Sequence, residues 1–175
     1  MTYKHLLSTL CIFILAFYLR FDWASHSFWV DEFSTASQAR VVLKYGFNPF
    51  FQRIDYFEAH NVTTHFIVAA LFHFFGESEF IARFPSMIFG ALVPVMLYVV
   101  GRQLFSAQVG FAAATLATFS YWLTTWSQQA RGYALQQLLV LATLFVYFSA
   151  QQKGFSTTKV ILLLVLATLG MLTHL

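Results

Sequence analysis

The chain has 175 residues, of which 59% are hydrophobic, 19% aromatic and 10% charged, and its mean hydropathy is +0.67. This composition excludes an ordinary soluble domain, because the apolar residues come in long blocks without strand-like alternation or coiled-coil heptads. The formal net charge of +3 comes from scattered basic residues and gives no signal for nucleic-acid binding. We therefore predict an all-helical integral membrane protein.

The first apolar block covers residues 6–21 and follows Lys4. It has the length of a signal peptide, but Arg20 and Asp22 interrupt its end and no small-residue cleavage site follows. We therefore expect an uncleaved membrane anchor with a cytoplasmic N-terminus. The only cysteine, Cys11, lies inside this block, so the chain forms no disulfide with itself.

A large external loop is predicted over residues 22–83. Charged residues alternate with aromatic residues in its first half, a composition that favours the headgroup region of a membrane. Residues 32–44 are expected to form an amphipathic helix ended by Gly46. Residues 62–75 are apolar, but they number fourteen, and a membrane span needs about twenty.

The positions of the basic residues decide whether residues 62–75 cross the membrane. If they lie in the interface, Lys4, Arg102, Lys153 and Lys159 all fall on one side, as the positive-inside rule requires. If they cross, only Lys4 stays inside. We therefore predict a bundle of about five spans, with juxtamembrane helices in the external loop. The expected spans are residues 6–21, 84–104, 110–126, 133–150 and 160–172.

Charged residues from distant parts of the chain then meet at the outer face. A carboxylate such as Asp31 or Glu32 can remove a proton from an attacking hydroxyl. Arg83 and Arg131 can stabilise a departing phosphate, because a guanidinium donates two parallel hydrogen bonds and keeps its charge. His60 and His174 are expected at the same face. No metal site is predicted, since the histidines have no cysteine partners and unsuitable spacing.

Five sequence blocks carry a resemblance to a known family. They are Phe28-Trp29-Val30-Asp31-Glu32, His60, Phe75-Gly76-Glu77-Ser78-Glu79-Phe80-Ile81-Ala82-Arg83-Phe84-Pro85-Ser86, Ser127-Gln128-Gln129-Ala130-Arg131-Gly132-Tyr133-Ala134-Leu135 and Thr173-His174. In this order they resemble the N-terminal half of GT-C glycosyltransferases. The branch is that of bacterial relatives of dolichyl-phosphate-mannose protein mannosyltransferases and of the aminoarabinose transferase. At His60-Asn61-Val62 the chain departs from the His-Pro-Pro of many members.

The resemblance implies Asp31 as the catalytic base with Glu32 beside it, and a polyprenyl-phosphate sugar as donor, with no cofactor or obligatory metal. It places His60 at the donor phosphate, where the charge argument also puts Arg83 and Arg131. We expect inverting transfer to a lipid, glycan or protein acceptor, outside the cytoplasmic membrane.

The alternative is a non-catalytic membrane protein, either a carrier of lipid-linked substrate or a scaffold subunit. A carrier should show internal repeats and charges at mid-membrane, whereas the charges here gather at helix ends. Because the last apolar helix is followed directly by Thr173-His174-Leu175, we expect residues 1–175 to be the N-terminal portion of a single, longer transmembrane domain.

Overall fold

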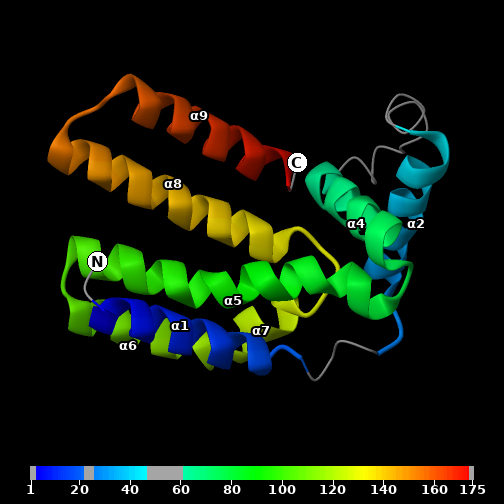
Figure 1. Ribbon diagram of the computed structural model, residues 1–175, viewed down its shortest axis with the longest axis horizontal. Helices are drawn as coiled ribbons and strands as arrows, with labels where there is room; N and C mark the ends of the chain where they lie inside the picture. The colour runs from blue at the N-terminus through cyan, green and yellow to red at the C-terminus, as the bar shows by residue number, and fades with distance from the viewer. Residues whose placement is uncertain (1–2, 22–25, 47–60, 174–175) are drawn as a thin grey trace.

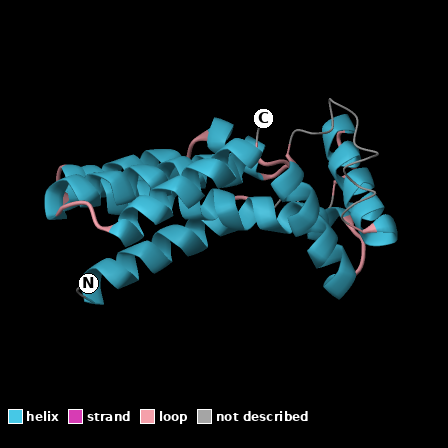
Figure 2. Cartoon of the chain, turned by 90° about the horizontal axis from the view of Figure 1, so that it is seen from above, coloured by secondary structure: helices cyan, strands magenta, loops and turns pink. Residues whose placement is uncertain are grey.

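The computed structural model describes residues 3–21, 26–46 and 61–173, with the side chain of Lys4 left out. Every regular element in these ranges is an α-helix. Most helices run side by side along the long axis of the molecule, while two of them lie together at one end (Figures 1 and 2). The helices are α1 (Tyr3–Tyr18), α2 (Val30–Tyr45), α4 (Val62–Phe75), α5 (Glu79–Leu104), α6 (Ala107–Thr118), α7 (Tyr121–Ser127), α8 (Tyr133–Lys153) and α9 (Thr157–Leu172).

The two ends of this bundle differ. Helices α2 and α4 lie at one end, which we call the α2–α4 end, close to the start of α5 (Figure 1). At the other end α5 and α8 finish, and α1, α6 and α9 begin; we call this the basic end (Figure 1). The predicted inner residues Arg102, Lys153 and Lys159 belong to the helix ends gathered there.

Both helices predicted in the external loop are present. The helix expected over residues 32–44 is α2, and that expected over residues 62–75 is α4 with the same bounds. Each ends at a glycine, Gly46 with φ of 76° and Gly76 with φ of 81°. These left-handed values strain any residue with a Cβ atom, so glycine at these two positions explains where the helices stop.

The single helix predicted over residues 110–126 is instead broken into α6 and α7. Thr118 donates a hydrogen bond from its hydroxyl to the carbonyl oxygen of Ala114, and Ser120 begins α7 by accepting from the amide of Leu123 at 3.4 Å. A serine hydroxyl satisfies an amide that a helix start leaves free, so Ser120 favours a new helix over continuation. The same contact precedes α5, α6 and α9, from Ser78, Ser106 and Ser156.

Apolar surface covers much of the bundle. Two described helices, Glu79–Leu104 and Tyr133–Lys153, are long and apolar enough to cross a membrane, and shorter apolar helices accompany them. No residue of α9 is buried, and its exposed side chains include Leu164 and Met171. An apolar surface of this extent is typical of helices that face lipid or further protein.

Small residues hold the α2–α4 end together. A buried cluster joins α2 to α4, to the first part of α5 and to the loop before α8. Alanine side chains let helix backbones approach closely, so the middle of α2 packs against these elements. The cluster contains Ala36, Ala39, Val68, Ala69, Phe72, Ala82 and Ala130.

Candidate functional site

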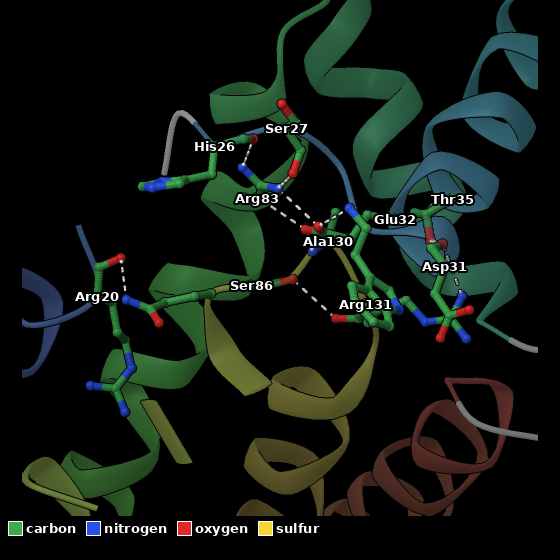
Figure 3. A network of polar contacts seen from close by, with 12 residues as sticks. Arg20, His26, Ser27, Asp31, Glu32, Thr35, Arg83, Ser86, Ala130 and Arg131 are labelled. Carbon is green, nitrogen blue, oxygen red and sulfur yellow. Dashed lines mark hydrogen bonds and ion pairs between the residues drawn. The ribbon is translucent and has the colours of Figure 1, made fainter. Parts of the chain in front are cut away.

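A buried ion pair joins the start of α2 to α5. The Nε atom of Arg83 lies 2.7 Å from Oε1 of Glu32, and Nη2 of Arg83 lies 2.8 Å from Oε2, so the guanidinium meets the carboxylate with two parallel hydrogen bonds (Figure 3). The side chains are 0% and 1% exposed. Taking both charges out of water is costly, and only close geometry with further hydrogen bonds offsets that cost.

Glu32 receives those further hydrogen bonds from two backbone amides. Oε2 accepts from the amide of Trp29 at 3.0 Å, and Oε1 accepts from the amide of Ala130 at 2.9 Å. The first contact is local, because Glu32 is the third residue of α2 and reaches back to the residue preceding the helix. The second is distant and ties α2 to the loop between α7 and α8.

The pKa of Glu32 reflects this environment. Burial by itself would raise the pKa of the carboxyl. The hydrogen bonds from Arg83, Trp29 and Ala130, together with the charge of Arg83, outweigh burial and hold the pKa below its ordinary value. Glu32 is therefore ionised at neutral pH, with two hydrogen bonds to each oxygen.

Arg83 is also fully engaged. Besides binding Glu32, it donates to the carbonyl oxygen of His26 through Nη1 and to that of Ser27 through Nη2, the latter at 3.1 Å. Its guanidinium carbon lies 5.3 Å from the centre of the Phe28 ring. All three nitrogens donate within the protein, so Arg83 fixes the chain that leads into α2.

Asp31 lies beside Glu32 in sequence but faces elsewhere. Consecutive residues of an α-helix point about 100° apart, so burying Glu32 turns Asp31 outwards. Asp31 is exposed, and within the described residues its carboxylate forms no ion pair. It also sits in the first turn of α2, where the helix dipole favours a negative charge.

Arg131 lies next to Asp31 (Figure 3). Its Nη1 atom donates to the carbonyl oxygen of Asp31 at 3.3 Å, and its guanidinium carbon lies 5.9 Å from the Tyr133 ring. The carbonyl oxygen of Arg131 accepts from the hydroxyl of Ser86 at 3.0 Å. In the part of the chain that the structure describes, Nε of Arg131 is buried and has no hydrogen-bond partner. Arg131 therefore keeps donors free, in contrast to Arg83.

The start of α4 supports the loop between α7 and α8, residues 128–132, which we call the Arg131 loop. Asn61, 2% exposed and with a left-handed φ of 69°, accepts a hydrogen bond from the amide of Gly132 at 3.3 Å. A Cβ atom on Gly132 would lie 2.6 Å from the carbonyl oxygen of Thr173 and 3.0 Å from the hydroxyl of Thr64. The loop is therefore closely packed where it passes α4, and only glycine fits there.

His65 lies buried in α4, 1% exposed. Burial first, and the positive charge of Arg131 second, lower the pKa of its imidazole to about 4. His65 is therefore neutral at physiological pH and adds no charge beside Arg131.

A cavity of about 320 Å³ opens beside Glu32. Aromatic rings line it together with hydroxyl and amide side chains, whereas Asp31 and Arg131 do not line it. Such a lining combines apolar ring faces with hydrogen-bonding groups, as small-molecule sites do. The side chains that characterise it are Trp29, Tyr121, Thr125, Gln128 and Gln129.

The structure brings Asp31, Glu32, Arg83 and Arg131 together at the α2–α4 end. His60 and His174 lie outside the described residues, so their predicted positions stay predictions. Sequence reasoning missed the roles of Asn61 and Gly132. The residue type of Asn61 could have indicated its role, because asparagine adopts the left-handed conformation more readily than most residues.

One comparison with known proteins identifies a family. The family model of dolichyl-phosphate-mannose-protein mannosyltransferase matches residues 59–175, which include Arg83 and Arg131 but neither Asp31 nor Glu32. The chain therefore belongs to this family of membrane glycosyltransferases. No curated protein and no solved structure matches the chain.

Proposed function

We propose that the chain carries the catalytic residues of a glycosyltransferase. The enzyme moves a sugar from a polyprenyl-phosphate donor to an acceptor at the outer face of the cytoplasmic membrane. The observation that carries the proposal is the different placement of the two neighbouring carboxylates. Glu32 is buried and saturated with hydrogen bonds, while Asp31 is exposed beside a guanidinium that has donors to spare.

Asp31 serves as the general base in this proposal. Its carboxylate takes the proton of the acceptor hydroxyl while the acceptor oxygen bonds to the anomeric carbon. The bond from that carbon to the phosphate oxygen breaks, and polyprenyl phosphate leaves with the electron pair. One direct displacement inverts the configuration at the anomeric carbon. A base held within hydrogen-bond reach contributes about 10²–10⁴ in rate.

The two arginines then have different tasks. Arg131 stabilises the departing phosphate, because its Nε atom lacks a partner within the described residues and its side chain adjoins Asp31. Arg83 does not contact the substrate in this proposal. It holds Glu32 and the segment before α2 in place. His60 remains a proposed phosphate ligand from the family resemblance.

The cavity beside Glu32 suits a sugar ring at some distance from the reacting bond, because neither Asp31 nor Arg131 lines it. Ring faces such as that of Trp29 can pack against the apolar side of a pyranose, and the amides of Gln128 and Gln129 can hydrogen-bond its hydroxyls. Replacing Trp29 with alanine should raise the KM for donor or acceptor sugar more than it lowers kcat.

No metal enters the proposed reaction, since arginine supplies the positive charge that a metal ion would otherwise supply. Treatment with EDTA should leave the transfer rate unchanged, and restoration of a lost rate by added Mg²⁺ or Mn²⁺ would assign a metal role.

We propose five membrane spans, formed by α1, α5, α6 together with α7, α8 and α9, with α2 and α4 in the outer interface. The positive-inside distribution of Arg102, Lys153 and Lys159 supports this arrangement. A cysteine at position 154, replacing Gly154, should be labelled only from the cytoplasmic side. Labelling from outside would overturn the count.

The catalytic proposal is tested with Asp31→Asn in the full-length protein. Radiolabelled polyprenyl-phosphate mannose and related donors are incubated with membranes that contain the protein, and label is followed into acceptors. We expect transfer to fall by about 10²–10⁴ with the melting temperature unchanged. Glu77→Gln is the matched control, because Glu77 is an acidic residue at the same end whose side chain is 46% exposed. Wild-type activity in Asp31→Asn would reassign the base, and donor binding without transfer by the wild-type protein would favour a carrier or scaffold.

A further inference from the structure

A second polar cavity lies at the basic end, remote from the candidate active site. Its volume is about 450 Å³, within the range of small-ligand pockets. It opens between the last turns of α5 and α8. The polar side chains on its wall are Tyr98, Arg102 and Gln103 from α5, and Ser149, Gln152 and Lys153 from α8.

The cavity carries two positive charges that the described protein does not neutralise. Neither Arg102 nor Lys153 forms an ion pair or donates a hydrogen bond within residues 3–21, 26–46 and 61–173. The sequence has no acidic residue after Glu79. Glu79 begins α5 and Arg102 is in its last turn, so the two lie about 35 Å apart along that helix. The described chain therefore offers these two cations no carboxylate, and an anion from outside can approach them.

Neighbouring groups fix the cavity rather than fill it. The hydroxyl of Tyr98, whose side chain is 3% exposed, lies 2.7 Å from Nδ1 of His5. Lys159 of α9 donates to the carbonyl oxygens of Ser149 and Gly154 at 3.2 and 2.9 Å, which joins α9 to the end of α8. These contacts hold the walls while Arg102 and Lys153 stay available.

The chemistry of the wall points to a phosphodiester that also carries a hydroxyl. Arg102 and Lys153 suit phosphate oxygens. The amide oxygen of Gln103 is buried without a partner in the described part of the chain, and it can only accept a hydrogen bond. Val99 and Phe145 complete the wall with apolar surface that suits the glycerol and upper acyl carbons of a lipid.

We propose that this cavity binds the headgroup of an anionic phospholipid of the phosphatidylglycerol type. Such a headgroup offers one negative charge and free hydroxyls, whereas the cation of a zwitterionic lipid would be repelled by Arg102 and Lys153. Basic pockets between membrane helices at the positively charged side are known to take anionic headgroups. The bound lipid would tie the ends of α5 and α8 together, and this role does not depend on the catalytic proposal.

The test uses purified full-length protein in detergent. Binding of phosphatidylglycerol is measured by native mass spectrometry, with phosphatidylcholine and inorganic phosphate in parallel. For Arg102→Gln combined with Lys153→Gln, we expect affinity for phosphatidylglycerol to fall roughly 30-fold. Each basic side chain near an anionic lipid contributes about 1 kcal/mol of binding free energy, and the two together correspond to this factor. Lys44→Gln is the matched control, because Lys44 is an exposed lysine on α2, which lies at the other end.

Two further arms keep the proposal open to refutation if the double variant does not fold. Exchanging the two residues, Arg102→Lys with Lys153→Arg, keeps both charges and should keep the lipid. A photoactivatable phosphatidylglycerol bound to wild-type protein should label peptides that contain residues 98–103 and 145–153. Labelling elsewhere, equal binding of phosphatidylcholine, or competition by millimolar inorganic phosphate alone would overturn the lipid assignment.

Discussion

Two arginine–glutamate pairs connect α2 to the region where α5 begins, and they differ in exposure to solvent. In both pairs an Nε atom lies 2.7 Å from a carboxylate oxygen. The Arg83–Glu32 pair is 0% and 1% exposed, whereas the Arg40–Glu77 pair is 45% and 46% exposed. Water competes for the exposed pair and is excluded from the buried one. Two ion pairs with the same distance therefore contribute differently to stability. Loss of a partner should destabilise the fold more at the buried pair than at the exposed pair.

The largest effect is expected when the buried pair is broken. Glu32→Gln leaves the charge of Arg83 buried without its counter-ion, which should lower the free energy of unfolding by about 3–5 kcal/mol. Thermal unfolding in detergent, followed by circular dichroism, measures this loss. A variant that removes both charges, Glu32→Leu with Arg83→Met, should recover part of the stability. If Glu32→Gln unfolds like the wild-type protein, the pair is not a structural anchor.

A smaller effect is expected from the packing beside the pair. Gly132→Ala places a methyl group 2.6 to 3.0 Å from Thr173, Asn61 and Thr64, and should cost about 1–3 kcal/mol of stability. Gly170→Ala is the matched control, since its Cβ atom would meet only Leu139 at 3.9 Å. Gly132→Ala should have a lower melting temperature than Gly170→Ala. Equal melting temperatures would mean that the Arg131 loop can shift to accommodate the methyl group at little cost.

Acidification should weaken the same region through His65. Because its folded pKa is lowered to about 4, the unfolded chain binds a proton first, between about pH 6.5 and 4. The stabilisation that neutral His65 provides is complete above about pH 6.5. As the pH falls through this window, the free energy of unfolding decreases by roughly 1–3 kcal/mol. Melting temperatures of the wild-type protein and His65→Gln across pH 4–7 should converge at low pH, and parallel curves would contradict this account.

The smallest effect is expected at the exposed pair. Arg40→Gln should change the free energy of unfolding by less than about 1 kcal/mol, because solvent and flexible side chains reduce the value of a surface ion pair. Added salt should narrow even this difference. A loss comparable with that of Glu32→Gln would show that exposure does not distinguish the two pairs.

The sequence predicted much of the local structure and part of the site. Hydropathy and glycine positions were enough for α4, because an apolar run bounded by Gly76 leaves few choices. The different roles of Asp31 and Glu32 could not be predicted, since the rotation of α2 about its axis depends on packing against α4 and α5. The break at Ser120 was also missed, because the apolar pattern continues through it. A serine cap is a weak local signal beside seventeen mostly apolar residues.

Half of the hydrogen bonds to Glu32 come from the amides of Trp29 and Ala130, which belong to the main chain. Side-chain scanning cannot remove these donors, so a survey of alanine variants would leave them out of any inventory of important positions. Only a proline or a backbone ester at position 130 would delete the distant one. Natural variants of this protein can therefore change the identity of residue 130 among small side chains and still keep the contact that anchors the loop.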